Sequence, residues 1–343
     1  MAVVNRKEEV TKFADKDARG IEIGPWFSPL TSKRDGYNCL VLDVFDAPQL
    51  RLRAKEDPAI SKDRIANIEE VDLLGSSTQI EDLVAGRREL ESFDYIISSH
   101  NFEHLPNPIK FLQGSGRVLK PGAMLSMAIP DKRFCFDHFR PHSTTSQLIA
   151  AYFEDRARPT LAQVFEMNSL HCRYRRGDEM QMTFTIADRL SDIVPLQTVR
   201  EAFDFWLSAE RTRDLSYNDA HCWTFTPRSF ELIMLDLIFL GLSPLAVREI
   251  SPPNGGEFYV HLQNVVGKES IDPSIYYARR AELLVHIREE LSWGRDGVEP
   301  AAPDGADAEI NLLRAEIAAL RGSRSWRITA PLRALSGRLL KAR

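Results

Sequence analysis

Residues 93–137 constrain the fold of this chain more than any other segment. An apolar run at 93–97 leads into the polar sequence SHNFEH. An amphipathic stretch, the turn sequence LKPG and a second apolar run at 124–130 follow. This order predicts a strand, a crossover helix and a parallel strand, which together form a βαβ unit. Ligands of such sheets bind beyond the carboxyl ends of the strands, so residues 100–104 and 131–137 are candidate site residues.

Shorter apolar runs on both sides of this unit extend the pattern. They alternate with helical segments, which predicts an α/β fold built on a doubly wound sheet with a mixed edge. The sequence SPPNGGE near residue 254 is typical of a hairpin loop between the last two strands. The other expected strands are 20–24, 40–44, 68–74, 245–250 and 258–266, with helices at 79–85 and 227–240.

The composition excludes some classes of protein. With 343 residues, of which 43% are apolar, the chain can bury a large core. Its net charge of −5 gives no reason to expect nucleic-acid binding. The four cysteines form no CxxC pair, which favours a reduced, cytoplasmic compartment. We expect no secretory signal, and no membrane-spanning helix because no apolar run reaches about 18 residues.

Changes in composition along the chain predict its domain organisation. Glycine, proline and aspartate in the sequence GRDGVEPAAPDGAD indicate a linker, and apolar residues after it keep heptad spacing. The expected parts are a lead-in (1–19), a sheet domain (20–267) with a helical insertion (141–220), a further helix (268–293), the linker (294–307) and a short coiled coil with a basic amphipathic tail (308–343).

The polar loop with its Glu103-His104 pair, followed by a proline and later by LKPG, strongly resembles the class I S-adenosylmethionine (SAM)-dependent methyltransferases of type 11. The resemblance covers about residues 18–267. It implies a Rossmann-like seven-stranded sheet whose last two strands form an antiparallel pair. It also implies that the chain is an enzyme with SAM as its cofactor, and that residues 141–220 form a substrate lid.

A possible cofactor site begins at the first strand. Glycine lets backbone approach a nucleoside closely, and an acid about 20 residues later can bind the ribose hydroxyls. The sequence EIGP resembles the branch of these methyltransferases with an LEIGP motif, although its second and third glycines are missing. The alternatives are an ordinary strand-end turn and a dinucleotide site, which the absence of G-x-G-x-x-G disfavours. The expected cofactor-binding residues are Glu22, Gly24, Pro25, Asp43, Val44, Ser76 and Ser99.

Methyl transfer from a sulfonium is an in-line displacement, and an alcohol acceptor must also lose a proton. Histidine and carboxylate side chains can accept that proton. We expect His100, His104 and Asp131 to be catalytic, because they follow the fourth and fifth strands. The alternative for His104 is a hydrogen-bond network that shapes the loop. Other candidate bases are Glu103, Asp137, His142 and His221.

Basic residues after the fifth strand could bind an anionic group of the acceptor. The expected acceptor-binding residues are Lys132, Arg133, Arg140 and His221. The alternatives are a surface ion-pair loop for the basic residues and a packing role for His221. We expect no metal ion, because the His-Cys pairs at 171–172 and 221–222 do not have the spacing of common zinc sites.

The basic C-terminal sequence SRSWRITAPLR is similar to the ends of bacterial glycosyltransferases and polysaccharide-modifying enzymes. This resemblance implies O-methylation of a sugar or cell-surface glycan intermediate. It also implies contact with a membrane surface or a glycosyltransferase complex through residues 308–343. The alternatives are a small-molecule or lipid acceptor, an inactive methyltransferase-like scaffold, and a tail that only solubilises the chain. The sequence leaves the acceptor atom and the oligomeric state open.

Overall fold

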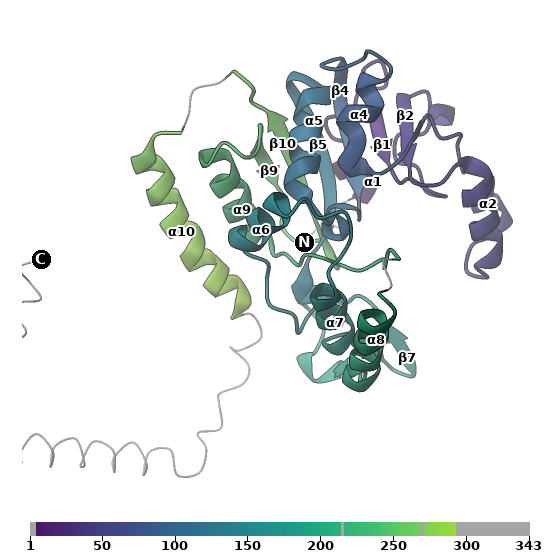
Figure 1. Cartoon of the computed structure of the whole chain (residues 1–343), viewed down its shortest axis with the longest axis vertical. Helices are drawn as coiled ribbons and strands as arrows, with labels where there is room; N and C mark the ends of the chain where they lie inside the picture. The colour runs from purple at the N-terminus through teal and green to yellow at the C-terminus, as the bar shows by residue number, and fades with distance from the viewer. Residues whose placement is uncertain (1–4, 214–215, 268–270, 293–343) are drawn as a thin grey trace, which may run out of the picture. The chain divides into compact units, whose positions relative to one another are not determined.

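A computed structural model describes residues 5–213, 216–267 and 271–292 (Figure 1). The chain divides into two compact units, Met1–Leu291 and Ser292–Arg343. The predicted linker at 294–307 and the predicted coil and basic tail at 308–343 lie outside the described residues. The fold described below is that of the first unit.

A seven-stranded sheet with the order β3-β2-β1-β4-β5-β10-β9 forms the centre of the first unit. The strands β3, β2, β1, β4 and β5 are mutually parallel, and β10 pairs antiparallel with both β5 and β9. This arrangement confirms the predicted Rossmann-like methyltransferase fold with an antiparallel final pair. Its strands are β1 (Arg19–Ile23), β2 (Asn38–Asp43), β3 (Leu73–Leu74), β4 (Phe93–Ser99), β5 (Leu119–Pro130), β9 (Leu245–Ile250) and β10 (Glu257–Asn264).

Helices cover both faces of this sheet. Figure 1 shows α4 and α5 side by side in front of the strands, whereas α1 packs against β5 and β10. The helices are α1 (Arg6–Val10), α2 (Ala47–Glu56), α3 (Lys62–Ile65), α4 (Ile80–Ala85), α5 (Pro108–Val118), α6 (Thr145–Phe153), α7 (Leu161–Ser169), α8 (Val199–Thr212), α9 (Pro227–Phe239) and α10 (Pro273–Leu291).

Alternation along β4 shows how the two faces are filled. Ile96 belongs to the large core beneath α4, α5 and α9, whereas Tyr95 and Ile97 belong to a smaller core with Val10 of α1. Successive side chains of a strand point to opposite faces, so a strand that is apolar at every position is buried on both sides. The apolar run at 93–97 therefore forms a central strand.

Local sequence signals fix the ends of the crossover helix and of α9. The Asn107 side chain accepts the Lys110 amide, and Pro108 occupies the first turn of α5. Thr226 and Ser229 form a reciprocal cap at the start of α9, with Pro227 as the first residue. Proline fits the first turn because the amides of that turn have no carbonyl partner within the helix, so the missing N–H of proline costs no hydrogen bond. These caps set where each helix leaves the carboxyl edge of the sheet.

Two expected elements differ from the structure. The third strand is only Leu73–Leu74, paired with Leu42–Asp43, whereas a strand was expected over 68–74. The LKPG sequence, expected as a turn before the strand, lies inside β5, where the register against β4 shifts between Phe93 and Tyr95. A bulge of this kind lets a strand continue through an irregular segment.

The insertion at 141–220 is not only helical as expected. It also holds a three-stranded sheet with the order β7-β6-β8, formed by β6 (Cys172–Arg176), β7 (Glu179–Gln181) and β8 (Ile193–Pro195). In β6, buried Cys172 and Tyr174 alternate with more exposed residues, which is the period of a strand. The segments are too short for that period to be recognised in the sequence. Figure 1 shows α7, α8 and β7 gathered below the main sheet.

In the described part of the chain, no helix has the length and apolar character needed to cross a membrane.

Candidate active site

A cavity of about 790 Å³ opens at the carboxyl ends of the parallel strands. Its walls come from the segments that follow β1, β2, β3 and β4, and from residues of the insertion. This volume falls within the usual range of about 300–1,000 Å³ for small-molecule sites. Of the expected site residues, Gly24, Asp43, Val44, Ser76, His100 and His104 line this pocket.

The part of the pocket after β1 and β2 fits a nucleoside. Gly24 adopts φ 58°, a left-handed conformation that favours glycine, and its amide donates to the Leu42 carbonyl. Asp43 ends β2, and its Oδ1 accepts the Phe45 amide at 3.0 Å. Burial raises the pKa of Asp43. A largely buried carboxylate beside a glycine turn is suited to accept hydrogen bonds from two ribose hydroxyls.

Glu22 does not line the pocket, although it was expected to bind the cofactor. Its carboxylate is buried and accepts the amides of Leu30 and Thr31 at 2.7 and 2.8 Å, together with the Thr31 hydroxyl. These bonds tie the loop after β1 back onto the strand. Glu22 therefore shapes the loop that lacks the second and third glycines.

Pro25 and Ser99 are also absent from the pocket wall. The Ser99 hydroxyl accepts the Arg6 guanidinium at 2.6 Å. Ser76, in contrast, lines the pocket and caps a short turn over Ser77–Gln79.

His100 follows β4 directly, in a left-handed conformation with φ 49°. Its Nε2 lies 2.8 Å from Glu257 and its Nδ1 lies 3.4 Å from Glu103. Burial lowers the pKa of His100, but the hydrogen bonds and charges of these two carboxylates outweigh it and raise the pKa to about 9. The loop conformation therefore presents a positively charged imidazole to the pocket at neutral pH.

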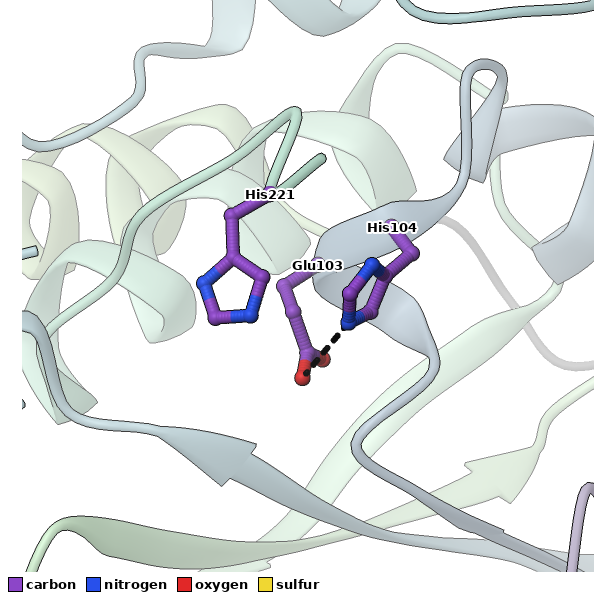
Figure 2. A group of neighbouring side chains, drawn as sticks. All are labelled: Glu103, His104 and His221. Carbon is purple, nitrogen blue, oxygen red and sulfur yellow. Dashed lines mark ion pairs between the residues drawn. The ribbon is translucent and has the colours of Figure 1, made fainter. Parts of the chain in front are cut away.

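Glu103, His104 and His221 come together beyond the end of β4 (Figure 2). Glu103 and His104 lie on the short turn Phe102–His104, and the two imidazole rings stand 4.6 Å apart between centroids. His104 Nδ1 lies 2.9 Å from Asp219, and His221 Nδ1 lies 2.5 Å from Asp137. Burial lowers the pKa of His104, but Asp219 and Glu103 raise it overall. The Nδ1 atom of each imidazole therefore lies next to a carboxylate.

Backbone contacts explain why His221 reaches this turn. The Trp223 amide donates to the Glu103 carbonyl at 3.2 Å, and the Trp223 indole donates to the Leu105 carbonyl at 2.6 Å. Trp223 is buried, and it fixes the segment before α9 against the turn after β4. Its neighbour His221 is thereby positioned against His104.

The residues after β5 occupy different surroundings from those expected. Asp131 is fully buried, and its carboxylate receives the Arg133 guanidinium at 2.6 and 2.9 Å. The Lys132 ammonium donates to the His138 carbonyl, and Arg140 pairs with Asp137 and Glu166. None of Asp131, Lys132, Arg133 and Arg140 lines the pocket. Asp131, Arg133 and Arg140 take part in buried ion pairs, and the Lys132 ammonium is bound by a backbone carbonyl.

Four pocket residues come from the insertion and were not expected: Arg156, Ala157, Tyr217 and Asp219. No local pattern marks them, since each lies in an irregular part of the sequence. Asn101 also lines the pocket, and its place directly after His100 in the polar loop was a usable signal.

The topology, the acid after β2 and the polar cluster after β4 define a SAM-dependent class I methyltransferase, with SAM as its cofactor. The chain belongs to the family described as "Methyltransferase domain", whose sequence profile matches residues 7–237. No curated protein matches the sequence.

Solved methyltransferase structures are similar to the chain at low sequence identity. One from Methanosarcina mazei is 11% identical over 75% of this chain and 96% of its own, with a TM-score of 0.34. One from Aquifex aeolicus is 14% identical over 76% of this chain and 90% of its own, with a TM-score of 0.36. The trans-methyltransferase CalH, in complex with SAH, is 11% identical over 75% of this chain and 54% of its own, with a TM-score of 0.35.

Proposed function

We propose that this methyltransferase transfers the methyl group of SAM to a hydroxyl oxygen of a sugar or cell-surface glycan intermediate. The observation that carries the proposal is the position of His104. Its imidazole lines the same cavity as Asp43 and is held by carboxylates on both sides, Glu103 and Asp219. A hydroxyl acceptor needs such a group to orient it or take its proton.

The reaction requires little beyond alignment and proton removal. The acceptor oxygen forms a bond to the methyl carbon as the bond from that carbon to sulfur breaks. The sulfur keeps the electron pair, so the sulfonium becomes the neutral thioether of S-adenosylhomocysteine. The hydroxyl proton leaves through the polar cluster to solvent. Positioning of the two reactants supplies much of the rate, and proton removal supplies a further factor of roughly 10²–10⁴.

The insertion side of the pocket supports a sugar as the acceptor. Tyr217 presents an exposed aromatic ring, and Arg156 and Asp219 present a donor and an acceptor of hydrogen bonds beside it. An aromatic surface combined with charged hydrogen-bonding groups suits a ring that is apolar on its faces and polar at its edges. A lipid tail would find few apolar groups on this wall.

The proposed cellular setting rests on the sequence of the tail. The similarity of residues 323–333 to the ends of bacterial glycosyltransferases supports a glycan acceptor in the cytoplasm. It also supports contact of residues 308–343 with an anionic membrane or a glycosyltransferase complex. A small-molecule or lipid acceptor is the alternative, and a screen of acceptors separates the two.

The test combines an acceptor screen with two histidine variants. Sugars, nucleotide sugars, small phenols and lipids are offered with SAM, and S-adenosylhomocysteine formation is measured. His104→Ala should lower turnover on the sugar acceptor by roughly 10²–10⁴ while leaving SAM affinity unchanged. His286→Ala, on α10 and away from the pocket wall, is the control. Near-normal turnover of His104→Ala, or transfer only to lipids or phenols, would contradict the proposal.

A further inference from the structure

We propose that Glu103, His104 and His221 form a binding site for one divalent transition-metal ion at the edge of the methyltransferase pocket. One potential ligand atom from each of these residues lies within 4.8 Å of the other two. Figure 2 shows the two imidazoles on either side of the Glu103 carboxylate. Metal–ligand bonds of about 2.0–2.2 Å would draw the three atoms closer together.

The Glu103 carboxylate is the strongest indication of a cation. Its side chain is 1% exposed, and neither oxygen has a well-aligned hydrogen bond to a group in the described part of the chain, although the His100 imidazole lies 3.4 Å away. Ion pairs without well-aligned hydrogen bonds compensate the burial of a carboxylate only in part. The nearest ring nitrogens are His100 Nδ1 at 3.4 Å and His104 Nε2 at 3.8 Å. The first is poorly aligned for a hydrogen bond, and the second is too far away. An ion between Glu103 and the histidines would satisfy these oxygens.

An outer carboxylate lies beside Nδ1 of each histidine, within hydrogen-bond geometry at His221 and at ion-pair distance at His104. His221 Nδ1 faces Asp137, and His104 Nδ1 faces Asp219, so each ring has its Nε2 left for a metal. Histidine ligands in proteins almost always donate their second N–H to such a partner, which fixes the tautomer. Arg140 in turn pairs with Asp137 at 2.7 Å. The arrangement has both the inner ligands and the outer supports of a metal site.

The ligand set selects the class of ion. Two imidazoles and one carboxylate suit zinc, iron, cobalt or manganese in the divalent state, whereas magnesium and calcium prefer sites made of oxygen atoms. Three protein ligands also leave coordination positions open, as in catalytic rather than structural zinc sites. His104 lines the pocket, so an open position can face an incoming acceptor.

The role of the ion rests on the proposed function, although its binding does not. An acceptor hydroxyl bound at the open position would have its pKa lowered by the positive charge and lose its proton to solvent. The resulting oxygen would then attack the methyl carbon as described above. In this arrangement His104 holds the ion and does not itself take the proton.

The experiment measures metal binding by the full-length chain. The protein is stripped with a chelator and titrated with Co²⁺ and Zn²⁺, followed by visible absorption and calorimetry. We expect one ion per chain, and binding weaker by at least roughly a hundredfold in Glu103→Gln and His221→Gln. His286→Gln should bind as the wild type does. If Glu103→Gln or His221→Gln fails to fold, His104→Gln, whose side chain is a quarter exposed, replaces it.

The outcomes separate this inference from the proposed function. No binding by the wild type, or unchanged binding by the ligand variants, overturns the metal site. If the wild type binds no ion but His104→Ala still loses turnover, the imidazole acts directly and the hydroxyl proposal stands. If the ion binds and the variants lose it, but no hydroxyl compound is methylated, the site stands and the proposed acceptor is wrong.

Discussion

His261 in the middle of the sheet and His104 at its carboxyl edge are both largely enclosed, yet their surroundings shift them in opposite directions. His261 is fully buried on β10, and its Nδ1 lies 2.8 Å from the Ser126 hydroxyl. Burial lowers the pKa of His261 to about 4. Asp219 and Glu103 instead raise the pKa of His104 above its usual value despite its burial. At His261 desolvation outweighs the nearby carboxylates, whereas at His104 the carboxylates outweigh desolvation.

The difference identifies which histidines belong to a site. A packing histidine needs only a neutral ring with a hydroxyl or carbonyl partner, such as the Ser126 hydroxyl beside His261 Nδ1. Three carboxylates around two histidines, one of them buried without a well-aligned hydrogen bond, cost stability that packing does not require. Groups of this kind concentrate where a protein binds or transforms a ligand.

Removing a buried support of the polar cluster should have the largest effect. Asp137→Ala leaves Arg140 buried with only Glu166 as its partner and should lower the free energy of unfolding by about 3 kcal/mol. Asp219→Ala is the matched control, because the Asp219 side chain is 75% exposed; its stability should stay within about 0.5 kcal/mol of the wild type. Urea denaturation measures both. Equal stabilities would show that the two carboxylates do not differ in burial as described.

The sheet histidine should make stability depend on pH. The pKa of His261 is about 4 in the folded chain, against about 6.5 when exposed. Below pH 6.5 the unfolded chain takes up the proton first, so stability falls as the pH drops, by about 3 kcal/mol once pH 4 is reached. The contribution is fully present above pH 6.5.

His261→Gln should remove this pH-dependent loss. The groups that face the ring are present in both the wild type and the variant. They are Ser126, Phe13, Glu9, Lys12 and Glu249. Unfolding free energies of the wild type and the variant at pH 7.5 and pH 4.5 give the difference directly. Parallel curves would mean that His261 is not held neutral by burial.

Asp43 offers a smaller and more local effect, on SAM affinity. Asp43→Ala should remove charge-assisted hydrogen bonds to the ribose worth roughly 1.5–3 kcal/mol, a tenfold or greater loss of affinity with the fold retained. Asp72→Ala is a useful control, since Asp72 bonds the Val41 amide and Lys33 outside the pocket. Calorimetric titration with SAM compares the two. Unchanged affinity in a folded Asp43→Ala variant would remove the nucleoside assignment.

Regular patterns made the sheet and part of the site predictable. The apolar run that forms β4 is continuous because this strand is buried on both faces. The end of the run places His100 and His104 at the carboxyl edge of the sheet. Asp43 could be located because it ends the second strand. The place of each of these residues follows from strand periodicity, which is present in the local sequence.

Partners that lie far apart in the sequence could not be predicted. The metal prediction considered adjacent His-Cys pairs, whereas the proposed ligands join the turn at 102–104 to His221, brought there by Trp223. Lys132, Arg133 and Arg140 were expected in the pocket, but Asp131 and Asp137 in the same segment pair with the two arginines. The opposite charges were visible in the sequence, yet only the fold shows that burial favours the pairs over a bound anion.

Deletion of the C-terminal sequence should have the smallest effect. This deletion tests whether the sheet and the site at its carboxyl edge work without that sequence. Every residue on the pocket wall lies between positions 23 and 219, and both the polar cluster and His261 precede residue 268. Deleting residues 308–343 should therefore leave SAM affinity and the metal titration unchanged. Association with anionic vesicles should fall, most clearly at low salt, where basic contacts are least screened. Lost SAM affinity in a folded truncated chain would place part of the cofactor site in the deleted segment.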